Sequence, residues 1–306
     1  MGDGLKAPRD PWPRRCRRDL VGAVLEAADL FPHSGQDNAA QIHSARKALK
    51  HARALARLFI PSADLAAYAA IDVLDKARRR IGKARDLDVM QEVAASLGDD
   101  LDAGAARHLT DAIAFEREVA RIAHGDIDVV SQTGELRALA RSIEGWDVAA
   151  TSSASLLRAL RAGYRGARRL GRQAFGEGAG DLHELRRFVV DLEHQFASFR
   201  PAWPALFLAL GAELRRLRQL LGEHNDLTML GEFAKSRRDI SLTQMSALAL
   251  KIERRQARLA RRAKASFARL FTERPSALEK RLAGYLDHSK TRAKALGSAS
   301  STESKD

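Results

Sequence analysis

Two stretches of the chain carry nearly the same pattern, Ile42-His43-Ser44-Ala45-Arg46-Lys47 and Leu182-His183-Glu184-Leu185-Arg186-Arg187. The spacing from His43 to His183 is 140 residues (183 − 43). A second set of residues returns at the same spacing: Arg78, Gly82, Asp86 and Leu87 become Arg218, Gly222, Asp226 and Leu227. One spacing kept across two motifs predicts a duplicated structural unit. Most of the repeated side chains are basic, and a hydrophobic core alone would not need them.

The composition predicts a surface with a strongly positive field. The 306 residues include 52 Lys and Arg against 39 Asp and Glu, a formal net charge of +13. Such a field attracts polyanions, whether nucleic acid, anionic lipid or a phosphate polymer. A single cysteine, Cys16, excludes an internal disulfide and fits a reducing compartment. No window approaches the ~20 apolar residues of a membrane span, and no signal peptide is recognisable, so we expect a soluble cytoplasmic protein.

The residue pattern predicts an all-α protein. Ala, Leu, Arg, Glu and Gln dominate, and runs of β-branched residues with period two are missing. Helices are expected at 14–30, 38–59, 63–81, 83–97, 102–124, 134–145, 153–175, 179–199, 204–230, 241–272 and 275–288. Residues 1–13 and 289–306 are expected to be disordered tails. No linker separates residues 14–150 from 151–288, so we expect two helical bundles packed as one unit.

The helix expected at 38–59 carries a basic face beside its apolar stripe. At ~100° per residue, five basic or titratable residues fall within an arc of roughly 80°: His43, Arg46, Lys50, Arg53 and Arg57. This face contains no acid, whereas a solvated helix face usually mixes both signs of charge. Because like charges at helical spacing repel, we interpret the face as one that an external polyanion compensates. An ordinary solvated face is the alternative.

Two further helices carry basic faces of the same kind. The first has Arg158, Arg161, Arg165, Arg168 and Arg172. The second has Lys251, Arg254, Arg255, Arg258, Arg261, Arg262 and Arg269. Arginine suits phosphate because its planar guanidinium donates two parallel hydrogen bonds and stays charged. We predict that the three faces converge on one positive groove or pore.

The repeat also keeps a histidine and a glycine in each copy. His43 and His183 hold equivalent positions about one turn before a basic pair, so a ligand role and a structural role are equally supported. Gly82 and Gly222 lie within helical patterns, where a glycine costs about 1 kcal/mol relative to alanine. We expect close backbone packing or a kink at both glycines.

The repeated aspartates are expected to be orienting groups. Asp86 and Asp226 lie beside the basic faces, where each can hold a His or Arg through a hydrogen-bonded ion pair. A metal-binding or general-base carboxylate is the alternative. This alternative is weaker because only one acid is repeated in both copies. The other acid of the first copy, Asp88, aligns with Thr228 in the second.

The ordered set of motifs resembles the CHAD domain, a family named for its histidine-containing α-helical architecture. The family pattern is hydrophobic-His-x-x-Arg-basic, then Leu-Gly-x-x-Arg-Asp-x-Asp-Val, then a repeat. In the first half the matching residues are His43, Arg46, Lys47, Lys50, Arg53, Arg78, Arg85 and Asp86. In the second half they are His183, Arg186, Arg187, Arg218 and Asp226, preceded by Arg165 and Arg168. The resemblance extends over nearly the whole chain, from about residue 14 to residue 286.

The resemblance implies two four-helix bundles related by pseudo-twofold symmetry, with a basic cavity between them. It also implies binding of inorganic polyphosphate and, in some members, location on polyphosphate granules. The basic faces add five candidate binding residues to those named above: Arg57, Arg161, Arg172, Arg254 and Arg258. No cofactor and no metal ion are expected.

This chain departs from the family pattern in its second half. Val190 stands where a lysine usually follows the arginine pair, and Asn225 replaces the arginine kept at Arg85. We therefore expect that helix of the second half to contribute less charge. The triphosphate-tunnel catalytic domain that accompanies some family members is not recognisable in the sequence.

Polyphosphate also suits the residues for a physical reason. It is a flexible polyanion without bases, so a row of cations binds it and releases its counterions. Proteins that bind single-stranded nucleic acid usually add aromatic residues on which bases stack, and only 6% of this chain is aromatic. Nucleic-acid binding through the phosphate backbone is the main alternative.

Catalysis is the less favoured class of function. The sequence lacks a GxxxxGK[ST] phosphate loop, HExxH, GxSxG and the usual cysteine–histidine metal spacings. A histidine phosphotransfer bundle that uses His43 or His183, and hydrolysis of polyphosphate, are the weaker alternatives. We expect binding without catalysis.

Overall fold

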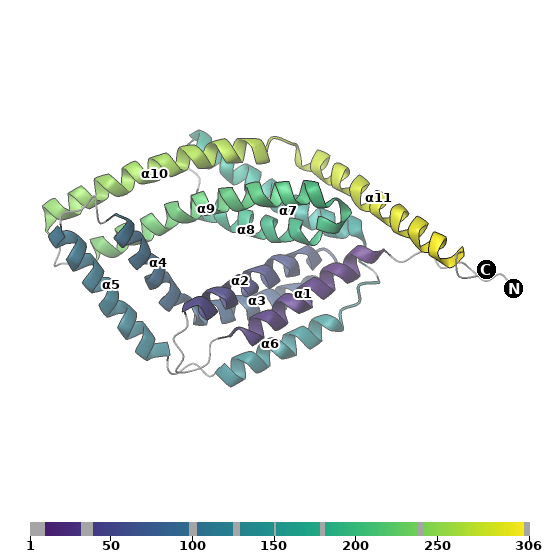
Figure 1. Cartoon of the computed structure of the whole chain (residues 1–306), viewed down its shortest axis with the longest axis horizontal. Coiled ribbons are helices and arrows are strands. Elements are labelled where there is room, and N and C mark those ends of the chain that lie inside the picture. The colour runs from purple at the N-terminus through teal and green to yellow at the C-terminus, as the bar shows by residue number, and fades with distance from the viewer. Residues whose placement is uncertain are drawn as a thin grey trace.

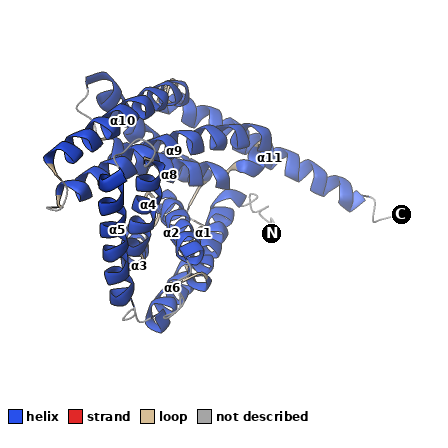
Figure 2. Ribbon diagram, turned by 60° about the vertical axis from the view of Figure 1, so that its left-hand side comes forward, coloured by secondary structure: helices blue, strands red, loops and turns tan. Residues whose placement is uncertain are grey.

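The computed structural model describes residues 10–31, 39–97, 103–124, 129–149, 151–177, 181–237 and 241–302. Over these residues the secondary structure consists of helices and turns, without a strand (Figure 2). The all-α prediction is therefore confirmed. Of the two predicted tails, residues 1–9 and 303–306 lie outside the described part of the chain.

The described residues form a succession of helices in each half of the chain (Figure 1). The first half contains α1 (Pro11–Asp29), α2 (Ala39–Ala56), α3 (Asp64–Arg80), α4 (Gly82–Ser96), α5 (Ala103–His124) and α6 (Val129–Glu144). The second contains α7 (Ser153–Arg172), α8 (Leu182–Ser198), α9 (Pro204–Lys235), α10 (Leu242–Leu270) and α11 (Pro275–Thr302). Short turns of other helix types follow α2, α7 and α8: η1 (Arg57–Phe59), η3 (Gln173–Glu177) and η4 (Arg200–Ala202).

The neighbours of each helix correspond between the halves. Helix α1 packs on α2 and α6, as α7 packs on α8 and α11. Helix α2 packs on α3 as α8 packs on α9, and the α4–α5 pair corresponds to α9–α10. One continuous helix, α9, thus takes the place of α3 and α4, which are separated at Ile81. The duplicated unit is visible in the helix pairing, and a twofold axis between the halves stays a prediction.

The start of the fold differs from the prediction of a tail over residues 1–13. Helix α1 begins at Pro11, and the Asp10 side chain accepts hydrogen bonds from the backbone N–H groups of Trp12 (3.3 Å) and Ser153 (2.6 Å). Trp12 is buried, with its ring 5.8 Å from that of Phe199. An aspartate N-cap followed by proline is a helix-start signal, so residues 10–13 belong to the fold.

Two other boundaries also differ from the prediction. Helix α11 continues to Thr302, so residues 289–302 are helical and the tail predicted at 289–306 is wrong over that range. Alanine, lysine, arginine and leucine between residues 290 and 296 favour a helix, whereas the Gly- and Ser-rich residues 297–302 do not. Helix α6 begins at Val129, five residues before its predicted start, and Gln132 in its first turn is buried and accepts a hydrogen bond from Arg80.

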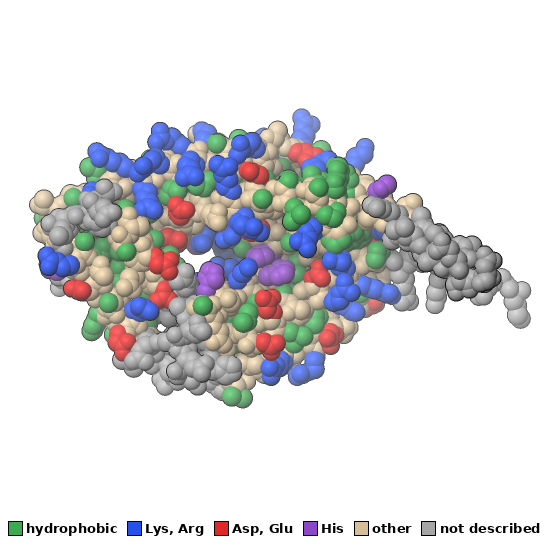
Figure 3. Space-filling view, viewed as in Figure 1, with side chains coloured by type: hydrophobic (Ala, Val, Ile, Leu, Met, Phe, Trp, Pro, Cys, Tyr) green, Lys and Arg blue, Asp and Glu red, His purple; other side chains and the backbone are tan. Residues whose placement is uncertain are grey.

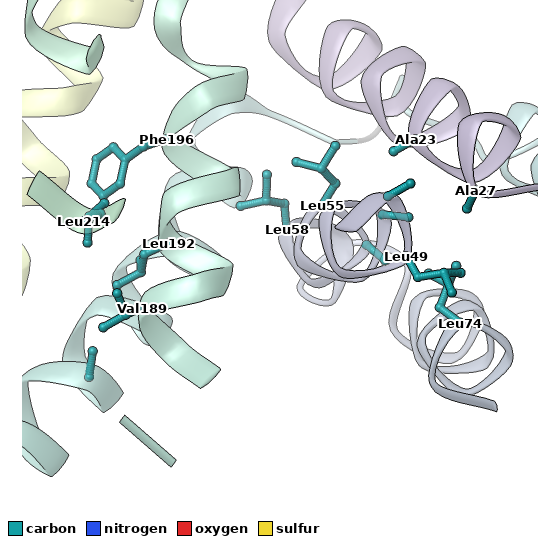
Figure 4. Close-up of a cluster of buried hydrophobic side chains, with 14 of the residues drawn as sticks. Ala23, Ala27, Leu49, Leu55, Leu58, Leu74, Val189, Leu192, Phe196 and Leu214 are labelled. Carbon is teal, nitrogen blue, oxygen red and sulfur yellow. The ribbon is translucent and has the colours of Figure 1, made fainter. Parts of the chain in front are cut away.

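One hydrophobic cluster extends through both halves (Figure 4). Leu49 and Leu74 lie in the part of the core formed by α1, α2 and α3. Leu192 and Phe196 of α8 lie in the part shared with α9. Leu58 of η1 projects from the first part toward α8. The two halves therefore share a core, and α2 packs directly against α8.

A buried ion-pair network also joins α2 to α8. Arg53 is 6% exposed and donates to Asp75 of α3 (3.1 Å) and to Asp191 of α8 (3.4 Å). Arg57 donates to the second oxygen of Asp191 (2.8 Å). Removing one member of such a network leaves an unpaired buried charge, which costs more than the pair itself contributes.

We expect Asp191→Asn to lower the free energy of unfolding by about 3 kcal/mol, because Arg53 and Arg57 would keep their charges without the shared carboxylate. Urea denaturation followed by circular dichroism measures the change. The matched control is Asp72→Asn, whose exposed pair with Lys76 should contribute no more than about 0.5 kcal/mol. Equal effects of the two substitutions would contradict a structural role for the buried network.

Candidate anion-binding site

Five cations from four helices meet where α2 packs on α8. Lys50 of α2 lies in the electrostatic field of four arginines, Arg186 of α8, Arg46 of α2, Arg78 of α3 and Arg218 of α9. Burial, together with these four guanidinium groups, lowers the pKa of Lys50 from 10.5 to about 7. We call these five residues the Lys50 cluster. All five were predicted site residues, and the structure brings them together from both halves.

Carboxylates interact with each arginine of the Lys50 cluster. Arg46 donates to Asp86 over 3.0 Å, so the prediction that Asp86 holds an arginine is confirmed. Its repeat counterpart Asp226 interacts electrostatically with Arg186. Burial raises the pKa of Asp226, although Arg186 opposes this effect.

The other two arginines share their acids with a further arginine. Asp75 pairs with both Arg78 and Arg53, and Glu193 pairs with both Arg218 and Arg215. Because each of these carboxylates is divided between two guanidinium groups, the region around Lys50 keeps an excess of positive charge.

Gly222 lies beside Arg186. A Cβ atom at this glycine would lie 3.4 Å from Nη2 and 3.5 Å from Nε of Arg186, which is ordinary van der Waals contact with a side chain. The expected close backbone packing or kink at Gly222 therefore stays a prediction. The Nε atom of Arg186 is buried without a hydrogen-bond partner among the described atoms.

His51 and His194, which are not equivalent positions of the repeat, lie at the junction of α2 and α8. The rings of His51 on α2 and His194 on α8 stack with centroids 4.9 Å apart and planes inclined by 22°. Burial lowers the pKa of both, and His51, Arg218 and nearby lysines help to lower that of His194 to about 3. Both rings are therefore neutral near pH 7, and they add no charge to the Lys50 cluster.

The two repeated histidines lie on the surface. His183 makes a 2.7 Å hydrogen bond between Nδ1 and Oδ1 of Asn225. Because an amide oxygen only accepts, Nδ1 of His183 carries the proton, and Nε2 is left for another partner. His43 is exposed on α2. The choice between a ligand role and a structural role stays open for both histidines.

The interpretation of the α2 basic face is wrong for two of its residues. Arg53 and Arg57 are compensated inside the protein, by Asp75 and Asp191, and need no external polyanion. The acids come from α3 and α8, which a helix-by-helix analysis of charge does not include. Lys47 and Arg187 are exposed, and Arg187 pairs with Glu184 over 3.4 Å.

Some arginines of α7 make contacts within the protein, and others line a hollow on its surface. Arg161 pairs with Glu279 of α11 (2.6 Å), and Arg168 donates to the carbonyl of Phe271 (2.9 Å) just beyond α10. A hollow beside Pro275 is lined by Arg165, Arg168, Arg169 and Arg172. These contacts hold α7 against the α10–α11 turn, and Arg165 and Arg172 stay exposed.

The α10 arginines line another hollow, with Glu223 of α9 at its edge. Its basic residues are Arg255, Arg258, Arg261 and Arg262. Arg254 is exposed on the same helix. The arginines of α7 and α10 thus surround two further hollows, and one cavity shared by all three basic faces stays a prediction. The remaining predicted residue, Arg85, belongs to α4, and its side chain lies outside the described part.

The space-filling view shows a hollow in the middle of one face, between α9 and α2 (Figure 3). Lys, Arg and His side chains gather around it, whereas acidic side chains lie mainly at its margin and on the outer surface (Figure 3). The Lys50 cluster belongs to these same helices and their packing partners α3 and α8. The arrangement can bind anions, because cations from both halves lie within each other's electrostatic field.

The acids that complete the site were missed in the sequence. Glu193 accepts hydrogen bonds from Arg215 (3.1 Å) and Arg218 (2.6 Å). At the 140-residue spacing, Glu193 corresponds to Arg53 and Arg215 corresponds to Asp75 (193 − 53 and 215 − 75). The α8–α9 pair therefore repeats the α2–α3 ion pair with its charges reversed. Such a reversal at two equivalent positions is a signal that could have identified these acids.

Among the described residues, no group of three or more His, Cys, Asp or Glu side chains could hold a metal ion. No helix in the described part of the chain is long and apolar enough to span a membrane.

The family model described as the CHAD domain matches residues 22–235, which is more than half of the chain. The match includes α2, α3, α4, α8 and α9, the helices that carry the Lys50 cluster and its acids. No curated protein matches the sequence.

We expect the His51–His194 stack to make the protein less stable in acid. An unfolded histidine binds a proton below a pH of about 6.5, whereas native His194 excludes it until about pH 3, so stability falls as the pH drops through this window. His194→Phe keeps the stack and removes this titration. Between pH 6.5 and 4.5 the variant should lose about 2 kcal/mol less than the original protein, as measured by urea denaturation. The exposed His288→Phe control should follow the original curve, and identical losses in His194→Phe would refute the assignment.

Proposed function

This chain belongs to the CHAD domain family, and we propose that it binds inorganic polyphosphate at the Lys50 cluster, without catalysis. The proposal includes location on polyphosphate granules, as the family resemblance implies. The observation that carries it is the meeting of five cations from both halves, where Asp75 and Glu193 are each shared with a further arginine.

The low pKa of Lys50 reflects its burial first and then the positive charge of the four arginines around it. An ammonium group ordinarily keeps its proton to a pH near 10.4, and here it titrates at about 7. Folding therefore assembles charges that repel one another, and the shared core and the buried ion pairs offset that cost. A bound polyanion reduces the repulsion between these cations, and this gain in free energy is the physical basis of the proposed binding.

A phosphate polymer suits this arrangement better than a single phosphate group does. The cluster, the exposed Lys47 and Arg187, and the arginine-lined hollows of α7 and α10 offer cations over a wide part of the surface. A flexible chain with about one charge per phosphate can contact several of these groups and release its counterions. None of the five residues of the Lys50 cluster offers an aromatic ring, which single-stranded nucleic acids generally use for stacking.

The decisive comparison is between long-chain polyphosphate and duplex DNA of equal total charge at ~150 mM salt. We expect polyphosphate to bind at least tenfold more tightly in a fluorescence titration, because the duplex is too stiff to enter a hollow between helices. Comparable affinities would favour nucleic-acid binding instead. Polyphosphate recovered after incubation with a divalent metal ion should keep its chain length on a gel, and shortening would overturn the non-catalytic part of the proposal.

Arg78 and Arg218 are the best residues to remove. Arg78 shares Asp75 with Arg53, and Arg218 shares Glu193 with Arg215. The double variant Arg78→Gln/Arg218→Gln therefore removes two cluster charges and leaves both acids paired.

We expect the double variant to bind polyphosphate about tenfold more weakly. Its plot of log K against log salt should flatten by about 1.4, or roughly 0.7 per lost phosphate contact. The control, Lys235→Gln/Lys280→Gln, makes the same change in net charge at exposed positions and should keep nearly the original affinity. If both double variants lose affinity equally, net charge and not the Lys50 cluster determines binding.

Polyphosphate binding should also be coupled to proton uptake. A bound polyanion stabilises the Lys50 ammonium and raises its pKa above about 7. The affinity should therefore increase as the pH falls from 9 to 7, and level off once free Lys50 is protonated. Calorimetry at pH 8 in two buffers of different ionisation enthalpy should show an uptake of close to one proton. Lys50→Arg should abolish it, and uptake that persists in that variant would assign the proton to another group.

A further inference from the structure

The hollow beside α10 contains none of the residues of the Lys50 cluster. Arg255, Arg258, Arg261 and Arg262 of α10 line it, and Glu223 of α9 lies at its edge. All four arginines lie beyond residue 235, where the match to the family model ends. Figure 3 shows Lys and Arg side chains gathered over α10 along the upper edge of the view. We call this site the α10 hollow.

Hydrogen bonds between α9 and α10 hold the two sides of the α10 hollow together. Gln256, next to Arg255 in the sequence, donates to the carbonyl oxygen of His224 (3.2 Å) and to the hydroxyl of Thr228 (2.7 Å). His224 follows Glu223 directly in α9. The position of the arginines relative to the carboxylate is therefore set by the packing of two long helices.

The charges that line the α10 hollow are not paired with one another. Arg255 donates to the hydroxyl of Ser96 on α4 over 2.9 Å, which positions the guanidinium group without neutralising it. Within the described part of the chain, no acid forms an ion pair with any of the four arginines, although Glu223 lines the same hollow. Both the guanidinium groups and the carboxylate are therefore available to a ligand.

The size of the α10 hollow suits a small molecule. Its volume is about 480 Å³, and small-molecule sites usually have volumes of about 300–1,000 Å³. Leu259, which is 4% exposed, adds an apolar surface to the charged side chains. A few polar groups around an apolar surface are typical of such sites.

The chemistry of the lining residues indicates two different groups on one ligand. The planar guanidinium of arginine donates two parallel hydrogen bonds to a phosphate. A carboxylate only accepts hydrogen bonds, so Glu223 repels a phosphate and suits a hydroxyl group. An acidic side chain binds the ribose hydroxyl groups in this way in dinucleotide-binding proteins. The first copy of the repeat has Lys83 in place of Glu223 (223 − 140), so the acid belongs to the second half alone.

We propose that the α10 hollow binds a nucleoside triphosphate, with its phosphates on the arginines and its ribose hydroxyl groups on Glu223. The proposed function uses these arginines only as further cations for the polymer. The inference goes beyond that function, because it assigns them a small ligand of their own. A bare phosphate chain has no hydroxyl groups along its length with which Glu223 could form hydrogen bonds.

The test compares ATP with 2′,3′-dideoxy-ATP by calorimetric titration of the intact protein. We expect ATP to bind at least fivefold more tightly, because hydrogen bonds to a charged acceptor are the stronger kind. Glu223→Ala should abolish this difference and leave the binding of inorganic triphosphate undiminished. Alanine favours a helix, so α9 should keep its structure. Equal affinities of the original protein for the two nucleotides would overturn the inference.

The variant Arg258→Gln/Arg262→Gln tests the phosphate side of the α10 hollow. ATP should bind about tenfold more weakly to it, whereas Lys235→Gln/Lys280→Gln, with the same change in net charge, should keep nearly the original affinity. Equal losses in these two variants would contradict a specific site.

The variant of the Lys50 cluster, Arg78→Gln/Arg218→Gln, distinguishes this inference from the proposed function. It should bind ATP as the original protein does, while its affinity for polyphosphate falls. Loss of ATP binding in this variant, with binding kept in Arg258→Gln/Arg262→Gln, would place the nucleotide at the Lys50 cluster and overturn the inference. Because the polyphosphate titration depends on the Lys50 cluster, the two proposals fail separately.

Discussion

The contact between α2 and α8 determines how the rest of the molecule is arranged. Helix α2 carries a row of basic side chains and α8 adds Arg186 and Arg187, while both helices bury an apolar stripe, so hydrophobic packing and charge repulsion act against each other at one junction. The shared core holds the helices together (Figure 4). Asp191 between Arg53 and Arg57 removes the repulsion on part of the junction. In the Lys50 cluster the acids remove the repulsion only in part, because Asp75 and Glu193 are each shared between two arginines.

Acidic side chains within the protein neutralise some of the basic side chains near this junction and leave others only partly neutralised. Asp75 of α3 pairs with Arg53 in the first half, and Glu193 of α8 pairs with Arg218 in the second. The acid therefore lies on the second helix of the pair in one half and on the first helix in the other. The stacked His51 and His194 are neutral, because burial and the surrounding cations oppose their protonation. Lys50 lies among four arginines, and burial together with their charges lowers the pKa of its ammonium group to about 7.

Much of the fold could be predicted because helix periodicity is a local property. The helix class and the order of the helices follow from residues that repeat at three- and four-residue steps. The start of α1 was predicted late, because the N-cap at Asp10 completes its bonding with Ser153, which is distant in sequence. The end of α11 was predicted early, although residues 290–296 favour a helix. Helices α3 and α4 are separated at Ile81, whereas α9 is continuous at the corresponding position. Glycine does not explain this difference, because Gly82 and Gly222 occur in both copies.

The sequence alone determined which residues are basic, their spacing along each helix, and the duplication that places Arg46 and Arg186, or Arg78 and Arg218, in equivalent positions. These are properties of one helix at a time, and periodicity is sufficient to detect them. Only the tertiary structure decided which cations are compensated, because their acids lie on other helices. It assigned Arg53 to Asp191, and it placed Lys50 among four arginines from both halves. A charge depends on its distance to every other charge, and that distance is established only when the two halves pack together.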